Sequence, residues 1–509
     1  MPGGFGLLLI FIALVAAVPR LSLGASQYIE YDGYWHVFIA QQDNWAGFWA
    51  EINSNAHPPL YFLLLRIALR FGHSLLVYRS ISLLTGIASV VLVGWIARKV
   101  TGSNVRACQS TLAYGLALPG IIVSCEVRSY MLSVFFILLS FLCLLDILGS
   151  GNTQGEARLR TGFAAGAILA CLSHYFAFFY SGAAIILLLG RFAVRKYKGE
   201  PASWRAEAAT ILPVAASIFA LYQLHAGRLA QIQGHLLPYY YNPQGHESVA
   251  VFLLRNWKNF LNLFSPYQIP SDSVAFGVLI LALFSGLLVA ALLRRAHDAA
   301  ALRASWTILI TGAMLAEFAL GALAGKYPFG GDLRQQYLLF PFLVLSVTIF
   351  VETIVGKLSG FVPVYGRLLL NALVIVAIVW VSVVRFEQYP KVGGNVAADR
   401  IAVFDQLEPA PTAVYLDQFN LITFFIYHHT WDWSFLQLRQ PIPGVDVYRL
   451  QRGPKQMLVF RDKTQWNLEP DDSAVYNKLA ECLRAEKIGN LSVFSARQTP
   501  PKPPFSDVK

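Results

Sequence analysis

The chain has 509 residues, of which 56% are hydrophobic and only 14% are charged. Ordinary soluble domains carry about 25% charged residues, so this composition excludes a soluble protein and indicates many membrane spans. The net charge is +11, which alone would allow a nucleic-acid partner. The excess lies in the apolar part of the chain, because residues 386–509 contain fourteen basic and fourteen acidic residues. We therefore expect a lipid bilayer, and no nucleic acid, as partner.

Apolar runs long enough to cross a bilayer set the expected number of spans. Eleven such runs lie at 5–24, 77–97, 107–125, 130–148, 161–177, 179–193, 208–226, 273–293, 306–324, 336–352 and 367–384. No basic segment precedes the first run, so we expect it to be retained as a span. With the N-terminus in the cytoplasm, the inner loops hold most of the Lys and Arg residues, as the positive-inside rule requires. Arg20, near the outer end of the first span, is an exception.

The first predicted outer loop is acidic and aromatic. From Ala25 to His57 it contains no Lys or Arg, and its four acids are Glu30, Asp32, Asp43 and Glu51. A carboxylate at the edge of a bilayer is costly and usually marks a functional site. The aromatic stretch 34–50 and the short apolar stretch 59–71 predict helices that lie in the membrane interface, and 249–264 predicts another in a later outer loop.

The character of the chain changes after Val384. Strands are expected at 412–416, 456–460 and 491–494. An amphipathic helix is expected at 473–487, because its apolar residues recur at helical spacing. The sequence therefore predicts an all-α polytopic membrane domain over residues 1–385. A small extracytoplasmic α/β domain with a Pro-rich tail should follow over residues 386–509.

The expected topology gathers the chemically reactive residues on the outer side of the membrane. They are Asp32, His36 and His57 in the first outer loop, Glu126, Arg128 and Tyr130 in the next, His174 after the fifth span, and Lys326, Tyr327 and Arg334 in a late loop. A carboxylate can take the proton of a hydroxyl acceptor, and basic groups or a metal ion can balance the charge of a departing phosphate. Each residue also has a purely structural interpretation. Asp32 would cap a helix, Glu126 and Arg128 would form a local ion pair, His57 would lie in a turn, His174 would be a hydrogen-bonded interfacial histidine, and Arg334 would extend to lipid headgroups.

Four short motifs resemble the GT-C superfamily of membrane glycosyltransferases. They are 31–36 (YDGYWH), 57–61 (HPPLY), 126–130 (EVRSY), and 327–331 (YPFGG) followed by Arg334 and Pro341. The similarity is nearest to the bacterial branch related to protein O-mannosyltransferases, the aminoarabinose transferases of lipid A and Rgt-type lipopolysaccharide enzymes. The HPPLY motif is the most specific of the four, and the layout of residues 1–385 resembles that of the superfamily.

The resemblance implies an inverting transfer of a sugar from a polyprenyl monophosphate to a glycan, lipid or protein acceptor on the outer face. It implies Asp32 as catalytic base, Glu126 as a second acidic site residue, and Arg128 and Arg334 as ligands of the lipid phosphate. Further substrate-binding candidates are Glu30, His36, His57, Tyr130, His174, Lys326 and Tyr327. A divalent cation is a candidate cofactor, with His57, Glu126 and His174 as candidate ligands. The family often has Asp-Glu in its first motif, whereas Gly33 follows Asp32 here, so the role of that second acid is lost or passes to Glu30.

Two other functions share parts of this pattern. A transporter or flippase of lipid-linked oligosaccharide needs polar or broken helices near the middle of the membrane, and Asp146 and Glu317 are the mid-span acids available. A polysaccharide polymerase also uses lipid-phosphate substrates, but that class usually has arginine-rich outer loops, and residues 25–57 of the first outer loop contain no arginine. The short loops are typical of a bacterial inner-membrane protein, whose C-terminal domain would then lie in the periplasm.

Overall fold

The computed structural model describes residues 3–27, 29, 31–55, 57–149, 155–228, 234–245, 247–264, 299–358, 363–389, 412–416, 432–436, 445–452, 455–462, 476–477, 480–481, 484–488 and 491–495. The chain divides into two compact units. The membrane unit comprises Met1–Gly24, Ile52–Leu64 and Arg79–Pro390. The sheet unit comprises Ala25–Glu51, Leu65–Tyr78 and Lys391–Lys509. Most of the first predicted outer loop therefore belongs to the same compact unit as the C-terminal residues.

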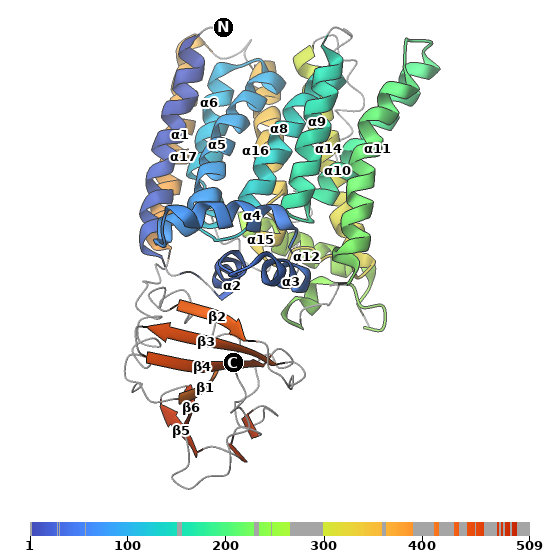
Figure 1. The fold of residues 1–509 in the computed structure, drawn as a ribbon. Coiled ribbons are helices and arrows are strands. Elements are labelled where there is room, and N and C mark those ends of the chain that lie inside the picture. Colours follow the sequence, from blue (N-terminus) through green and yellow to red (C-terminus); the bar gives the residue numbers. More distant parts are fainter. Residues whose placement is uncertain are drawn as a thin grey trace. The chain divides into compact units, whose positions relative to one another are not determined.

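The membrane unit is a bundle of helices, most of them long, that lie side by side (Figure 1). They are α1 (Gly3–Ser26), α5 (Leu75–Thr101), α6 (Asn104–Leu116), α7 (Leu118–Ser124), α8 (Tyr130–Gly149), α9 (Glu156–Ser173), α10 (Ala177–Tyr197), α11 (Trp204–Leu224), α14 (Ala299–Leu323), α16 (Leu339–Leu358) and α17 (Val364–Gln388). Two further helices, α12 (Val249–Phe264) and α15 (Leu333–Gln336), lie across one end of the bundle, here termed the α12 end (Figure 1).

Ten of the eleven predicted apolar runs fall on these helices, and the run at 273–293 lies outside the described residues. Seven of the described helices are long and apolar enough to cross a membrane, namely α1, α5, α8, α10, α11, α14 and α17. The pair α6 and α7, bent by 55°, would make an eighth span. The chain is thus a mostly helical integral membrane protein, as its composition predicted. The total of eleven spans stays a prediction.

The bend between α6 and α7 is held by Arg20, which is fully buried in the bundle. Pro119 has no backbone N–H, so the carbonyl of Gly115 cannot receive its normal helical hydrogen bond. Arg20 Nη1 donates to that carbonyl and to the carbonyl of Ala16 at 2.8 Å, and its Nε donates to Ser124 Oγ at 3.1 Å. Arg20 is therefore a structural residue of the bundle, which explains why it does not follow the positive-inside pattern of the loops.

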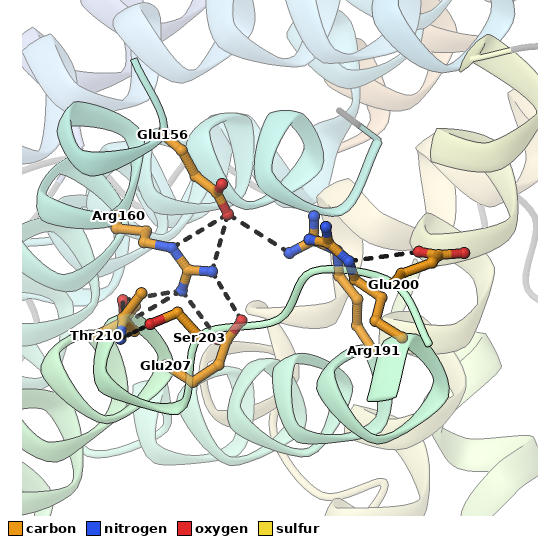
Figure 2. A network of polar contacts seen from close by, with 9 residues as sticks. Glu156, Arg160, Arg191, Glu200, Ser203, Glu207 and Thr210 are labelled. Carbon is orange, nitrogen blue, oxygen red and sulfur yellow. Dashed lines mark hydrogen bonds and ion pairs between the residues drawn. The ribbon is translucent and has the colours of Figure 1, made fainter. Parts of the chain in front are cut away.

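Ion pairs join the helices at the end of the bundle opposite the α12 end, and Figure 2 shows one of these networks. Arg160 on α9 contacts both carboxylate oxygens of Glu207 on α11, at 2.7 and 2.9 Å, and the hydroxyl of Thr210 at 3.1 Å. Glu156 accepts from Arg160 at 2.9 Å and lies 3.7 Å from Arg191 on α10. Fork-like contacts between a guanidinium and a carboxylate are directional as well as strong, so this network joins α9, α10 and α11.

Asp146 also lies at this opposite end, near the last turn of α8. It pairs with Lys99 of α5 at 2.6 Å and with Arg303 of α14 at 3.3 Å. This arrangement makes Asp146 an anchor between helices. It is therefore a weak candidate for the mid-membrane transport acid considered above. Glu317, the other such acid, is half-buried on α14 against Gly182 of α10.

The first predicted outer loop folds into three short helices and a single turn of 3₁₀ helix. These are α2 (Tyr31–Ala40), α3 (Trp45–Ser54), α4 (Pro59–Ala68) and η1 (Leu69–Phe71). The helices expected over 34–50 and 59–71 are present, although the first is divided in two. The break between α2 and α3 ends at Asn44. The side chain of Asn44 accepts the backbone N–H of Gly47 at 2.8 Å and so caps the N-terminus of α3.

The sheet unit contains six strands in the order β2-β3-β4-β1-β6-β5. They are β1 (Thr412–Leu416), β2 (Asp432–Leu436), β3 (Val445–Arg452), β4 (Lys455–Asp462), β5 (Arg484–Ile488) and β6 (Leu491–Ser495). Strand β1 is parallel to β4, and the other neighbours are antiparallel. All three predicted strands are confirmed. The helix predicted over 473–487 is wrong at its end, because 484–488 pairs with β6 as a strand, and sheet pairing overrides the weak helical preference of such a segment.

The loop after α14 depends on Gly330 to reach α12. Gly330 has a φ of +75°, and a Cβ there would lie 2.2 Å from the backbone oxygen of Asn256. Gly325, in the same loop, has a φ of +65°, but a Cβ added there would meet nothing within 4 Å. Both glycines satisfy a backbone conformation that other residues adopt at a cost. Only at Gly330 would a side chain also clash with a neighbouring segment.

We predict that Gly330→Ala destabilises the protein much more than Gly325→Ala. The second change adds only backbone strain of about 1–2 kcal/mol. The first adds that strain and a clash with α12, for a total of at least about 3 kcal/mol. The apparent melting temperatures of the two purified variants in the same detergent test this. Equal melting temperatures would contradict the close approach of this loop to α12.

Candidate functional site

Several of the predicted site residues meet at the α12 end of the membrane unit. They lie in the connections between α7 and α8, between α9 and α10 and between α14 and α16, and just before α4, and they are His57, Glu126, Arg128, Tyr130, His174 and Arg334. These connections are far apart in the sequence. They meet because successive helices run in opposite directions, which brings every second connection to the same end of the bundle.

Arg128 and His57 form the first contact of this site. Arg128 Nη1 donates to His57 Nε2 at 2.8 Å. A guanidinium can only donate, so Nε2 of His57 must be an acceptor and its proton must be on Nδ1. His57 is therefore held as a neutral imidazole. The backbone carbonyl of Arg128 is fixed separately by the hydroxyl of Ser82, at 2.8 Å.

His174 follows the last residue of α9 and is buried. Its Nδ1 accepts the backbone N–H of Phe176 at 3.1 Å, so a neutral ring carries its proton on Nε2. Burial, reinforced by the positive charge of Arg128, lowers the pKa of His174 to about 3. Its ring packs against Tyr130 at 4.6 Å and against His57 at 5.2 Å between centroids. The site thus contains two neutral imidazoles beside an arginine.

Arg334 lies in α15, whose N-terminal cap is Asp332. The carboxylate of Asp332 accepts the backbone N–H of Arg334 at 3.2 Å and its Nε at 2.8 Å. Burial disfavours the charge of Arg334, but the nearby Glu126, Tyr130 and Asp332 outweigh it and raise the pKa of its guanidinium. Arg334 is therefore positively charged at every physiological pH. Asp332 was not among the predicted site residues, although an Asp directly before a short helix is a recognisable cap signal.

Tyr327 and Lys326 lie in the loop after α14 but differ in their surroundings. Tyr327 donates to the backbone oxygen of Gln335 at 3.1 Å and packs against Phe179 and Phe318. It therefore supports the backbone just after Arg334. Lys326 is exposed.

The remaining candidates belong to the sheet unit or lie outside the described residues. Asp32 is half-buried and lies in the first turn of α2, one residue after the start of the helix. His36 is buried, and its Nδ1 contacts the backbone oxygen of Asp32 at 2.7 Å. Glu30 lies outside the described residues. The structure describes Asp32 and His36 within a different compact unit from Glu126, Arg128 and Arg334.

The three candidate metal ligands do not form a metal site. Among the residues that the structure describes, no group of three or more His, Cys, Asp or Glu side chains could hold a metal ion. The chemistry agrees, because His57 Nε2 receives a hydrogen bond from the cation of Arg128 and His174 Nδ1 is used by the backbone of Phe176. His57 Nε2 and His174 Nδ1 are therefore engaged by hydrogen-bond donors and are not available to a metal ion.

We predict that His174 makes the stability of the protein depend on pH. Its folded-state pKa is lowered, so its contribution is present above the unfolded pKa of about 6.5 and is lost as pH falls toward the folded value. About 2 kcal/mol should be lost between pH 7 and pH 5. His174→Asn retains an acceptor without titrating, so the melting temperature of that variant should fall less over this range. Identical pH profiles for the two proteins would contradict a buried neutral His174.

No protein-family model matches the sequence, and no curated protein matches it in sequence. Solved structures do match. The structure of ArnT from Cupriavidus metallidurans bound to undecaprenyl phosphate has a TM-score of 0.51 and 15% identity, over 84% of this chain and 85% of ArnT. The apo structure of ArnT also has a TM-score of 0.51, with 14% identity over 96% of this chain and 97% of ArnT.

A third similar structure is that of the Archaeoglobus fulgidus oligosaccharyltransferase in complex with Zn and sulfate, with a TM-score of 0.45 and 13% identity. It aligns with 78% of this chain and 55% of its own. The two ArnT structures, which align over nearly equal shares of both chains, establish the likeness of fold. The resemblance to the GT-C glycosyltransferases that the sequence motifs indicated is therefore confirmed at the level of the fold.

Proposed function

We propose that the chain is a membrane glycosyltransferase that moves a sugar, with inversion, from a polyprenyl monophosphate to an acceptor on the outer face of the membrane. Its fold is similar to that of ArnT, whose structure was solved with undecaprenyl phosphate. The acceptor would be a glycan, a lipid or a protein. By the positive-inside rule the N-terminus would be cytoplasmic, and the membrane would be a bacterial inner membrane.

The observation that carries this proposal is the cluster of Arg128 and Arg334 with neutral histidines at one end of the bundle. A transfer from a polyprenyl phosphate releases a phosphate, whose growing negative charge must be balanced. Guanidinium groups are suited to this, because they donate in a fork that matches phosphate oxygens. Arg334 would stay charged throughout, and His174, with its proton on Nε2, would donate a neutral hydrogen bond.

The proposed reaction is a single displacement. The acceptor oxygen attacks the anomeric carbon, the bond from that carbon to the phosphate oxygen breaks, and the phosphate leaves with the electron pair. The acceptor proton passes to Asp32. General-base assistance of this kind is typically worth about 10²–10⁴-fold in rate. Glu126 would hold Arg334 in place for the phosphate, in keeping with its effect on the pKa of that guanidinium.

We predict that Asp32→Asn lowers sugar transfer by about 10²–10⁴-fold, because an amide cannot accept the proton. Mass spectrometry of glycans and lipids from cells that lack the gene, complemented with either form, would measure the product. Binding of undecaprenyl phosphate to the purified variant should be unchanged, since the proposed ligands of the phosphate are Arg128 and Arg334. Product at the wild-type level in the variant would remove Asp32 from the mechanism.

Arg334→Gln should weaken the binding of undecaprenyl phosphate by about 10–100-fold, because a hydrogen bond to a charged group is worth about 1.5–3 kcal/mol. Arg255→Gln is a suitable control. Arg255 is an exposed arginine of α12 that pairs with Glu247 at 2.9 Å, and its removal should leave binding unaltered. Affinities of the two variants and the wild type, measured in nanodiscs at one salt concentration, decide the matter. Equal losses in both variants would indicate general electrostatic attraction in place of a site at Arg334.

A further inference from the structure

We propose that the C-terminal sheet and Arg66 position the helix that carries Asp32. The inference rests on the proposed function for the catalytic role of Asp32. Its structural part stands on contacts within the sheet unit alone. That unit combines α2, the first part of α3, the end of α4 and the six-stranded sheet. The C-terminal sheet would then contribute to catalysis by holding the helix that carries Asp32.

The sheet contacts α2 and the turn after it through β2 and β3. Phe38 of α2, fully buried, lies edge-on to Tyr448 of β3 with 6.3 Å between ring centroids. Tyr448, also buried, packs in turn against Phe435 of β2 at 5.8 Å. The backbone N–H of Phe435 donates to the carboxylate of Asp43, just after α2. Aromatic pairs of this geometry contribute beyond their buried area, so the sheet holds both the middle and the end of this segment.

Arg66 of α4 holds the C-terminal end of α2. Its Nη1 donates to the backbone oxygens of Ala40 at 3.0 Å and Gln42 at 2.7 Å. The last carbonyls of a helix have no partner within it, and a cation there is also favoured by the helix dipole. The guanidinium lies 4.9 Å from the ring of Trp45 and 5.3 Å from that of Phe48. Arg66 therefore joins α2 to α3 by hydrogen bonds and by cation–π contacts.

These contacts matter because α2 has only ten residues. A helix of this length is not stable in isolation, so its position depends on what it packs against. Asp32 is in its first turn, and the contacts with Arg66 and the sheet lie toward its other end. A short helix moves as a rigid body, so a shift at that end is transmitted to Asp32. A misplacement of about 1 Å can cost about 10²-fold in rate.

Arg66→Ala tests the proposal against the matched control Arg70→Ala. Arg70 is an exposed arginine one turn further along, in η1. In full-length protein in nanodiscs, Arg66→Ala should speed hydrogen exchange in residues 31–40 and leave α8 unchanged. It should lower the turnover number for transfer by about 10²-fold without changing the affinity for undecaprenyl phosphate. Arg66→Lys should restore part of the turnover, and Arg70→Ala should behave as wild type.

A second pair of variants keeps the test decisive if Arg66→Ala does not fold. Tyr448→Ala should speed exchange in 31–40 in the same way, whereas Tyr448→Phe, which keeps the ring, should not. Wild-type exchange in 31–40 for both alanine variants would overturn the positioning role, as would faster exchange with unaltered turnover. A normal product level in Asp32→Asn would instead overturn the proposed function, and the exchange data would remain interpretable without it.

Discussion

Arg334 keeps its charge in a half-buried position because the carboxylates of Glu126 and Asp332 lie close to it. Charge at the edge of a bilayer is costly unless it is compensated, so these groups must remain together. Glu126 and Arg334 lie in connections separated by about two hundred residues of sequence. Their association requires that α8, α14 and the helices between them pack in the observed order. The ion pairs at the opposite end of the bundle help to secure that order.

The two kinds of chemistry proposed for the chain belong to separate compact units. The candidate phosphate ligands, Arg128 and Arg334, are in the membrane unit, whereas the candidate base, Asp32, is in the sheet unit. In the proposed reaction, the polyprenyl carrier would enter from the bilayer and the acceptor would arrive from the aqueous side. A substitution in the membrane unit would then change donor binding, and a substitution in the sheet unit would change proton transfer.

Much of the fold could be predicted from the sequence, because hydropathy and helical spacing are local properties. The helix at 249–264 and the strand at 412–416 have the boundaries that their patterns indicated. The break between α6 and α7 was not predicted, although Pro119 was a visible signal for it. The strand at 484–488 could not be recognised, since its conformation depends on pairing with β6.

The sequence indicated which residues lie in the candidate site better than it indicated the contacts that hold them there. Charged and aromatic residues at the ends of alternate spans pointed to His57, Glu126, Arg128, His174 and Arg334, and these do meet. The partners that fix them could not be read from local patterns. The contact of Arg66 with the end of α2, like the hydrogen bond from Ser82 to Arg128, joins residues far apart in the chain.

The most direct test of the proposed donor site is a cryo-electron microscopy structure of the full chain with undecaprenyl phosphate in a nanodisc. We expect the phosphate to bind at the α12 end, within hydrogen-bond reach of the guanidinium groups of Arg128 and Arg334. A phosphate bound at the opposite end of the bundle, beside Arg106 or Arg160, would contradict this site.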